Sequence, residues 1–151
     1  MGFSASDGFL ASVQRNSVAL MSLCIAIVAL TQNTIRAERT EDNRNTRYAA
    51  FEILREATRL QLLVDHAHYD VGSREGNPIV GWGHVQYMQD LSLVLPPAIG
   101  EQADQVKSVW HERFSDLGAE DRASSLSANE ALTKSIQALR RDVKATLLAL
   151  E

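Results

Sequence analysis

The order of hydrophobic and polar positions divides the chain into an uncharged apolar stretch near its beginning and a longer amphipathic part. Residues 17–35, SVALMSLCIAIVALTQNTI, carry no charge. Their strongly apolar portion, Val18 to Leu30, is shorter than the roughly 20 residues that a membrane-spanning helix needs. The pattern nevertheless favours a single-pass transmembrane anchor over residues 17–35.

Two alternatives to an uncleaved anchor remain open. A cleaved signal peptide needs a small-x-small site after the apolar run, and the nearest match, Ala29-Leu30-Thr31, ends in an unsuitable threonine. A lipoprotein site is not favoured, because Leu23 and not a small residue precedes Cys24. The second alternative is a helix buried in the protein's own core. The uncleaved anchor fits the pattern best.

Arginines flank the apolar stretch unequally. Only Arg15 precedes it, and four arginines follow it: Arg36, Arg39, Arg44 and Arg47. Positive residues beside a span favour the cytoplasmic side of the membrane. We therefore expect residues 1–16 to be extracytoplasmic and the C-terminal part to be cytoplasmic, with the anchor in an inner or plasma membrane.

Small residues form a line within the apolar stretch. They are Ala19, Ser22, Ala26 and Ala29, at spacings that place them on one side of a helix. Small residues allow membrane helices to approach closely. We interpret them as a packing face for another membrane helix, although alanine and serine also align by chance in such segments.

Residues 36–47, RAERTEDNRNTR, are polar all round and form a juxtamembrane stalk. They contain no proline or glycine, so a continuous helix is plausible. Their threonine, asparagine and aspartate residues lower helix propensity, so a break is the open alternative.

From residue 48 to residue 151 the pattern predicts four amphipathic helices. The first runs from Tyr48 to about His68, with Glu52, Glu56 and Arg59 on its polar side. A loop over 69–77 follows. The connections are short, so the expected fold is a four-helix up-down bundle behind the anchor.

Cap residues mark the later helices. Asn77-Pro78 predicts the start of a second helix, which Pro96-Pro97 ends. The third begins at Pro97, and Gly118 suits the left-handed position after its end. A capping box, Ser127 to Glu130 with Leu126 as a staple, predicts the start of the fourth.

Composition narrows the classes of function. The net charge is −4 and both signs are interspersed, so no basic face of the kind that binds nucleic acid is present. The single cysteine, Cys24, has no partner for an intrachain disulfide, and it says nothing about the redox compartment.

Metal ligation has one set of candidates, the run from Asp65 to Asp70, with His66, His68 and Asp70 as ligands. Residues two apart on a helix project about 200° from each other, so the two histidines do not converge while the helix continues. We favour the alternative that they stabilise a helix C-terminus. No cofactor is expected.

Aromatic residues are the candidates for a partner or ligand surface. They are Tyr48, Trp82 and Tyr87, of which Trp82 lies between Gly81 and Gly83. A tryptophan between glycines more often fills the end of a core than lines a ligand site. Two glycines without a lysine do not make a nucleotide-binding loop.

No catalytic arrangement is apparent. The serines at 124, 125 and 127 are explained by helix capping, and paired carboxylates fall on apparently solvated faces. Arg140, Arg141 and Lys144 form a basic patch that suits either solvent or anionic lipid headgroups. We expect no enzyme activity.

The leading functional hypothesis is a non-enzymatic, membrane-anchored helical module that binds a protein partner or itself. It would serve as a scaffold, as an accessory subunit of a membrane complex or as a homo-oligomer. The first alternative is a regulatory bundle that senses a ligand held between helices. The second is a metal-binding protein that uses His66 and His68.

Overall fold

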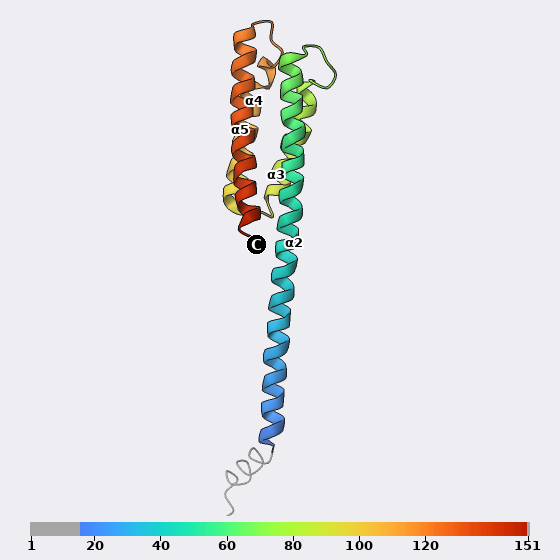
Figure 1. Ribbon diagram of the computed structural model, residues 1–151, viewed down its shortest axis with the longest axis vertical. Helices are drawn as coiled ribbons and strands as arrows, with labels where there is room; N and C mark the ends of the chain where they lie inside the picture. Colours follow the sequence, from blue (N-terminus) through green and yellow to red (C-terminus); the bar gives the residue numbers. More distant parts are fainter. Residues whose placement is uncertain (1–15, 151) are drawn as a thin grey trace, which may run out of the picture. The chain divides into compact units, whose positions relative to one another are not determined.

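The structure is a computed structural model that describes residues 16–150, and within this range it contains helices and turns but no strand. The α-helices are α2 (Ser17–Tyr69), α3 (Pro78–Ser92), α4 (Pro97–Arg113) and α5 (Arg122–Leu148), with the 3₁₀ helix η1 (Phe114–Asp116) after α4 (Figure 1). The predicted all-α class is confirmed. The expected extracytoplasmic segment, apart from residue 16, lies outside the described residues, as does Glu151.

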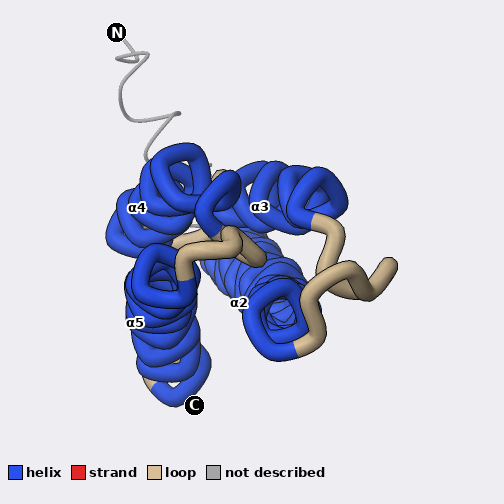
Figure 2. Tube along the Cα trace, turned by 90° about the horizontal axis from the view of Figure 1, so that it is seen from above, coloured by secondary structure: helices blue, strands red, loops and turns tan. Residues whose placement is uncertain are grey.

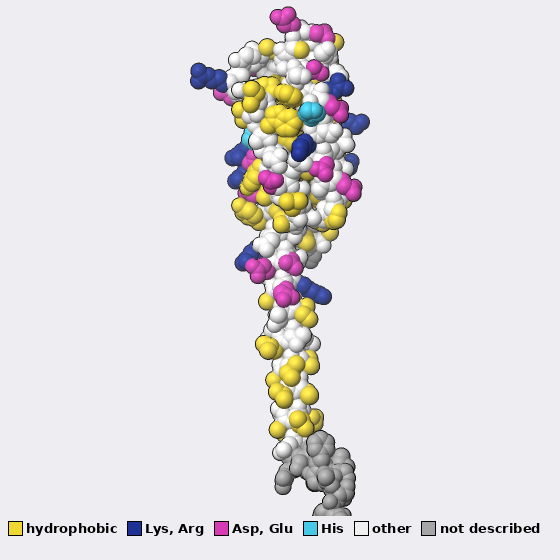
Figure 3. All heavy atoms as spheres, turned by 180° about the vertical axis from the view of Figure 1, so that it is seen from behind, with side chains coloured by type: hydrophobic (Ala, Val, Ile, Leu, Met, Phe, Trp, Pro, Cys, Tyr) yellow, Lys and Arg dark blue, Asp and Glu magenta, His cyan; other side chains and the backbone are white. Residues whose placement is uncertain are grey.

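Helix α2 contributes to two compact units, Met1–Asp42 and Asn43–Glu151. In the described part of the first unit, apolar side chains face outward; Val18 is 75% exposed and Leu30 is 69% exposed. Figure 3 shows these hydrophobic side chains over the surface of the segment. Among residues 16–150, α2 alone is long and apolar enough to cross a membrane, by length and composition.

Hydroxyl groups in this first unit bond to their own helix. Ser22, Thr31 and Thr34 donate to the carbonyl oxygens four residues earlier, at 2.8, 2.9 and 3.1 Å. These bonds give each of the three hydroxyl groups an acceptor within its own helix. A lipid environment requires this, because it offers no water to accept the hydrogen bond. The polar stretch 36–47 is also helical throughout, so the alternative of a break is not observed.

The second unit is a bundle of four helical segments, the first of which is the C-terminal part of α2. Consecutive helices run in opposite directions along the bundle (Figure 1). The end-on view in Figure 2 shows the four segments around a common centre. Helix α4 packs on both α3 and α5, and hydrogen bonds join α2 to α3 and to α5.

The core of the bundle is built from the apolar stripes that the sequence predicts. Ile53, Leu60, Val106, Leu132 and Leu139 are fully buried representatives of α2, α4 and α5. From α3, Val85 and Met88 are each 1% exposed. Burial of side chains of this size contributes about 1.5–3 kcal/mol each, and this burial is the main force that holds the bundle together.

Trp110 of α4 is the largest of the fully buried side chains, and it packs against the backbone of α3 at Gly81. A Cβ atom at Gly81 would lie 2.1 Å from Cζ2 of Trp110. Only glycine therefore permits this approach of the two helices. At Gly83, in contrast, an added Cβ would meet nothing within 4 Å.

The predicted starts of α3 at Pro78 and of α4 at Pro97 are confirmed, as is the left-handed glycine at 118, whereas the predicted end of α3 and start of α5 are wrong. Asn77 caps α3 by accepting from the amide of Ile79, and Gly118 adopts φ +74° after η1. Helix α3 ends at Ser92, before Pro96, because Leu93 to Leu95 form a turn. Helix α5 does not begin at Ser127.

The cap of α5 is Asp121, six residues before the predicted Ser127. Its carboxylate accepts from the amides of Ala123 and Ser124 at 3.3 and 3.1 Å. The predicted staple residue Leu126 lies inside the helix and is 44% exposed. An aspartate cap in front of a run of alanines and serines is sufficient to start the helix earlier.

Candidate functional site

A buried carboxylate joins α2 to α3. Glu56 is 4% exposed, and its Oε2 lies 2.7 Å from Nδ1 of His84, while Nη1 of Arg59 donates to its Oε1 at 2.6 Å. The guanidinium of Arg55 is 3.9 Å from the same carboxylate. The expectation that Glu56 lies on a solvated face is therefore wrong, because α3 covers that side of α2.

This Glu56 cluster is organised by two helices that meet 28 residues apart in sequence. Arg55 and Arg59 keep more than half of their side-chain surface exposed, whereas Glu56 keeps 5% of its own. The carboxylate thus contacts the less exposed His84 on one side and the guanidinium of Arg59, which extends toward solvent, on the other. A buried carboxylate needs such partners, because an unpaired buried charge is costly.

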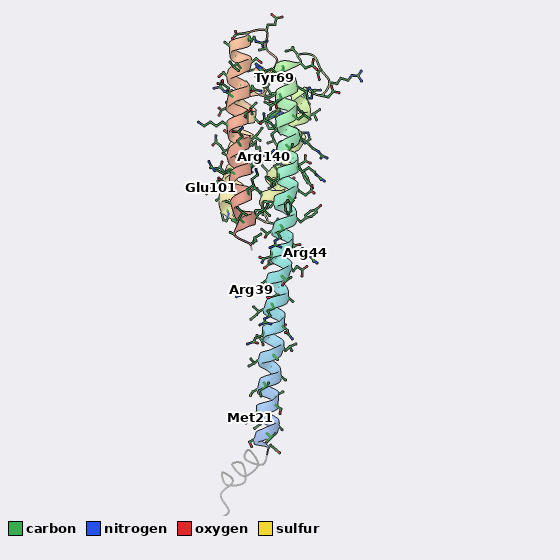
Figure 4. All side chains as sticks on the ribbon, in the orientation of Figure 1. Met21, Arg39, Arg44, Tyr69, Glu101 and Arg140 are labelled. Atoms are coloured by element: carbon green, nitrogen blue, oxygen red, sulfur yellow. The ribbon has the colours of Figure 1, made fainter. Side chains whose placement is uncertain are left out.

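A second set of polar side chains lies along the contact between α2 and α5. Gln61 donates to Thr133 at 2.9 Å, Asn129 donates to Asp65 at 3.5 Å, and Nδ1 of His68 lies 2.7 Å from Oγ of Ser125. Near the other end, Arg140 donates to Thr58 at 2.6 Å (Figure 4). As the residue number rises along α2, that of its partner on α5 falls, so α2 and α5 are antiparallel. These hydrogen bonds fix their register.

The three candidate metal ligands have separate surroundings. His68 is buried and hydrogen-bonded to Ser125. His66, two residues earlier on α2, is half-buried. Asp70 is exposed, and its amide bonds to the carbonyl of His66. Within residues 16–150 no group of three or more His, Cys, Asp or Glu side chains is placed to hold a metal ion.

His68 and Ser125 also line a pocket of about 200 Å³, together with Glu120 and Arg122. A serine hydroxyl hydrogen-bonded to an imidazole is the starting arrangement of nucleophilic catalysis. Here both side chains are more than nine-tenths buried, at 3% and 4% exposure, and each satisfies the other. This bond is sufficiently explained by the packing of α2 on α5.

The predicted partner surface does not form one face. Trp82 packs against Phe114 and His111, with ring centroids 5.7 and 6.0 Å apart, and is partly buried. Tyr87, five residues later on α3, projects about 140° away from it and is 41% exposed. Tyr48 lies on α2 and is 64% exposed. The interpretation of Trp82 as a side chain at the edge of the core agrees with these contacts.

Exposed apolar side chains do line up on α2, where sequence reasoning identified only Tyr48. We call them the outer stripe of α2: Tyr48, Phe51, Leu62 and Tyr69, which are 64%, 61%, 57% and 69% exposed. Their spacings of 3, 11 and 7 residues keep them on one side of the helix. The signal was present in the sequence, but the stronger core stripe of the same helix concealed it.

The small residues Ala19, Ser22, Ala26 and Ala29 all lie in the helical part of the first unit, and all are exposed. Their use as a packing face stays a prediction. The basic patch of α5 forms the wall of a shallow groove of about 380 Å³, lined by Arg140, Arg141, Lys144 and Leu148 among others. All residues of this groove come from one helix.

Three exposed groups have shifted pKa values. The hydroxyl of Ser124, followed by two backbone amides, lowers the pKa of Asp121, and Ser73 together with a backbone amide lowers that of Glu75. Asp142 raises the pKa of Arg141 by accepting from its Nε at 2.8 Å. These groups belong to caps, turns and surface pairs, and none lies in the Glu56 cluster.

No protein-family model, curated protein or solved structure matches this chain. Arguments about function therefore rest on its own residues.

Proposed function

We propose that this protein is a non-enzymatic, membrane-tethered helical module, which holds a protein partner or further copies of itself at the membrane. The observation that carries the proposal is the composition of α2. One helix has an outward-facing apolar segment over residues 17–35 and, further along, a face that builds the core of a bundle. An apolar segment with no protein cover needs lipid around it.

Two further observations support a lipid environment for this segment. Its Ser22, Thr31 and Thr34 hydroxyls are bonded within the helix. Polar arginines follow it directly, as is usual at the cytoplasmic end of a span. We therefore place the N-terminus outside and the bundle in the cytoplasm.

The proposed role in binding a partner rests on apolar side chains that are exposed on the bundle. The outer stripe of α2 exposes four large apolar or aromatic side chains, and α3 exposes Ile79 and Val80 at 74% and 53%. Surface apolar groups that are aligned, and not scattered, are typical of interaction sites.

The test is photocrosslinking of the full-length protein in its own membranes. A benzophenone amino acid is placed at Phe51, at Tyr87 and, as a control, at the charged surface position Glu101. The proposal predicts a discrete adduct from Phe51 or Tyr87 and none from Glu101. A protein that forms no adduct at any of the three positions and has the mass of a monomer in mild detergent is not such a module.

A further inference from the structure

Helix α3 is attached to the bundle on two sides only. In the end-on view it lies between α2 and α4, at the corner opposite α5 (Figure 2). Its His84 contacts Glu56 of α2. Its Gln89 donates to Asp104 of α4. Helix α5, in contrast, packs on α4 and is hydrogen-bonded to α2, and neither contact involves α3. The bundle formed by α2, α4 and α5 therefore keeps its own contacts when α3 moves away.

The apolar surface that holds α3 in place is small. Four residues of α3 are buried, against eight of α5, and among the four only Val85 and Met88 are large apolar side chains. Because the stabilisation follows the apolar area that is covered, α3 is held more weakly than α5. Ile79 and Val80 of α3 face outward, at 74% and 53% exposure, and add nothing to this attachment.

Glycine content and an unpaired indole lower the stability of α3 further. Gly81 and Gly83 both lie inside α3, and only proline is less favourable than glycine in a helix interior. Beneath Gly81, Nε1 of Trp110 is buried, and no described residue accepts its hydrogen. The ring carbon that carries this nitrogen, Cε2, is among the atoms that lie against Gly81. A buried donor without an acceptor destabilises the packed state, and removal of α3 gives the donor access to water.

We propose that α3 opens as a unit from an otherwise folded bundle and that this opening controls access to a surface of α2 and α4. Local opening at a lower free energy than global unfolding is usual for segments with few buried apolar contacts. Residues 70–77 and 93–96, which flank α3, form turns and bends and no helix. Helix α3 can therefore unfold without unwinding the ends of α2 and α4.

The surface that α3 covers contains Glu56, Asp104 and Trp110. In the closed state Glu56 and Trp110 are 4% and 0% exposed. A partner that requires either side chain consequently binds the open state only, and its binding shifts the population toward that state. The bundle thus has one surface that is always exposed and another that is exposed only when α3 opens.

Hydrogen exchange of the full-length protein in detergent micelles, measured by mass spectrometry of its peptides, tests the proposal. After correction for intrinsic rates, amides of residues 82–92 in α3 should exchange at least about tenfold faster than those of residues 132–143 in α5. Low concentrations of guanidinium should accelerate exchange in α5 much more than in α3, because local opening exposes little surface. Equal protection of the two helices, or an equal dependence on guanidinium, overturns the proposal.

A variant of α5 separates the opening of α3 from unfolding of the whole bundle. Thr133→Ala removes the acceptor of Gln61 in the contact between α2 and α5, which does not involve α3. Loss of this hydrogen bond should accelerate exchange in α5 by about twofold to tenfold. The amides of α3 should keep their rate, because their opening leaves the contact of α2 with α5 intact. Equal acceleration in both helices means that α3 opens only with the whole bundle, and this result overturns the proposal.

Thiol labelling provides a second readout, at matched buried positions. Cys24 is first replaced by serine, and single cysteines are then introduced as Val85→Cys on α3 and Ala128→Cys on α5, at residues that are 1% and 0% exposed. The thiol at position 85 should react with iodoacetamide at least about tenfold faster than the thiol at position 128. Circular dichroism verifies that both variants keep their helix content. Equal labelling rates in two folded variants contradict the opening of α3.

These measurements concern the bundle and not the membrane tether. Equal protection of α3 and α5 in a protein that stays in membranes after carbonate extraction refutes the opening and leaves the tether intact. Selective opening of α3 in a protein that carbonate releases supports the opening and refutes the tether.

Discussion

Glu56 places a carboxylate in the contact between α2 and α3, where it lies 2.7 Å from His84 and 2.6 Å from Arg59. Glu56 is only 4% exposed, so loss of these partners leaves its carboxylate poorly hydrated. Removing one partner from the cluster should therefore cost more stability than the whole cluster contributes, because it leaves the other group buried and unpaired.

Replacing Glu56 by alanine should lower the free energy of unfolding by about 1–3 kcal/mol, because His84 loses its partner in a covered site. Glu56→Gln should cost less, since the amide oxygen still accepts a hydrogen bond. Thermal unfolding followed by circular dichroism measures both. Glu101→Ala, at an exposed position, is the control, and a loss for Glu56→Ala no larger than the control's would mean that the cluster contributes nothing to stability.

Gly81 and Gly83 form a matched pair on α3. Gly81→Ala forces a methyl group against the ring of Trp110, 2.1 Å from Cζ2, and overpacking of this kind costs about 1–3 kcal/mol. Gly83→Ala has open space and should stabilise the helix by about 0.5–1 kcal/mol. Opposite shifts of the melting temperature are expected, and equal shifts would contradict the observed packing of α3 on α4.

Asp121 links stability to pH through its role as the cap of α5. Because its pKa is lower in the folded protein than its ordinary value of 3.8, its contribution is complete above that value. The contribution is lost as the pH falls through the folded pKa. Asp121→Ala should lower the melting temperature at pH 7, and its deficit relative to wild type should shrink as the pH falls below about 4. A deficit that stays constant between pH 7 and pH 3 would show that the carboxylate charge is irrelevant to the cap.

Single-residue roles were predictable from sequence only where they depend on near neighbours. Asn77 and Gly118 act on residues next to them, and both were predicted correctly. The partners Glu56 and His84 are 28 residues apart, and their contact depends on how α3 packs on α2. Asp121 was overlooked because the capping-box pattern at Ser127 matched a known motif more completely.

Among the elements, α2 combines three stretches that the sequence treats separately. The apolar segment, the polar stalk and the first bundle helix differ in composition, but no proline or glycine occurs between residues 17 and 69. Helical hydrogen bonding therefore continues through all three. The stripes of the later helices have clear spacing, so their existence was predictable, while their ends depend on turns such as Leu93 to Leu95.

A charge in the apolar stretch of α2 should prevent its insertion. Ile27→Lys introduces an ammonium near the centre of the segment, at a cost of about 2.5–3.5 kcal/mol on insertion scales. Thr40→Lys lies in the polar stalk and should have little effect. The membrane-integrated fraction after synthesis in the presence of microsomes measures both variants. Equal integration of the two would contradict the proposal that residues 17–35 span the membrane.

For the molecule as a whole, the fold class can be predicted from sequence patterning, whereas the exposed apolar stripe of α2 cannot. Patterning predicts helices and a core, because burial follows spacing. The outer stripe of α2 becomes recognisable only when the core face of the same helix is known, since either set of apolar residues alone would predict burial. Recognising the outer stripe as a proposed interaction surface therefore required the structure, whereas the fold class did not.

Carbonate extraction of membranes that contain the full-length protein, with a C-terminal reporter active only in the cytoplasm, tests the central claim most directly. We predict that the protein stays in the membrane pellet and that the reporter is active. Release of the protein into the supernatant would contradict membrane tethering, and a retained protein with an inactive reporter would contradict the orientation.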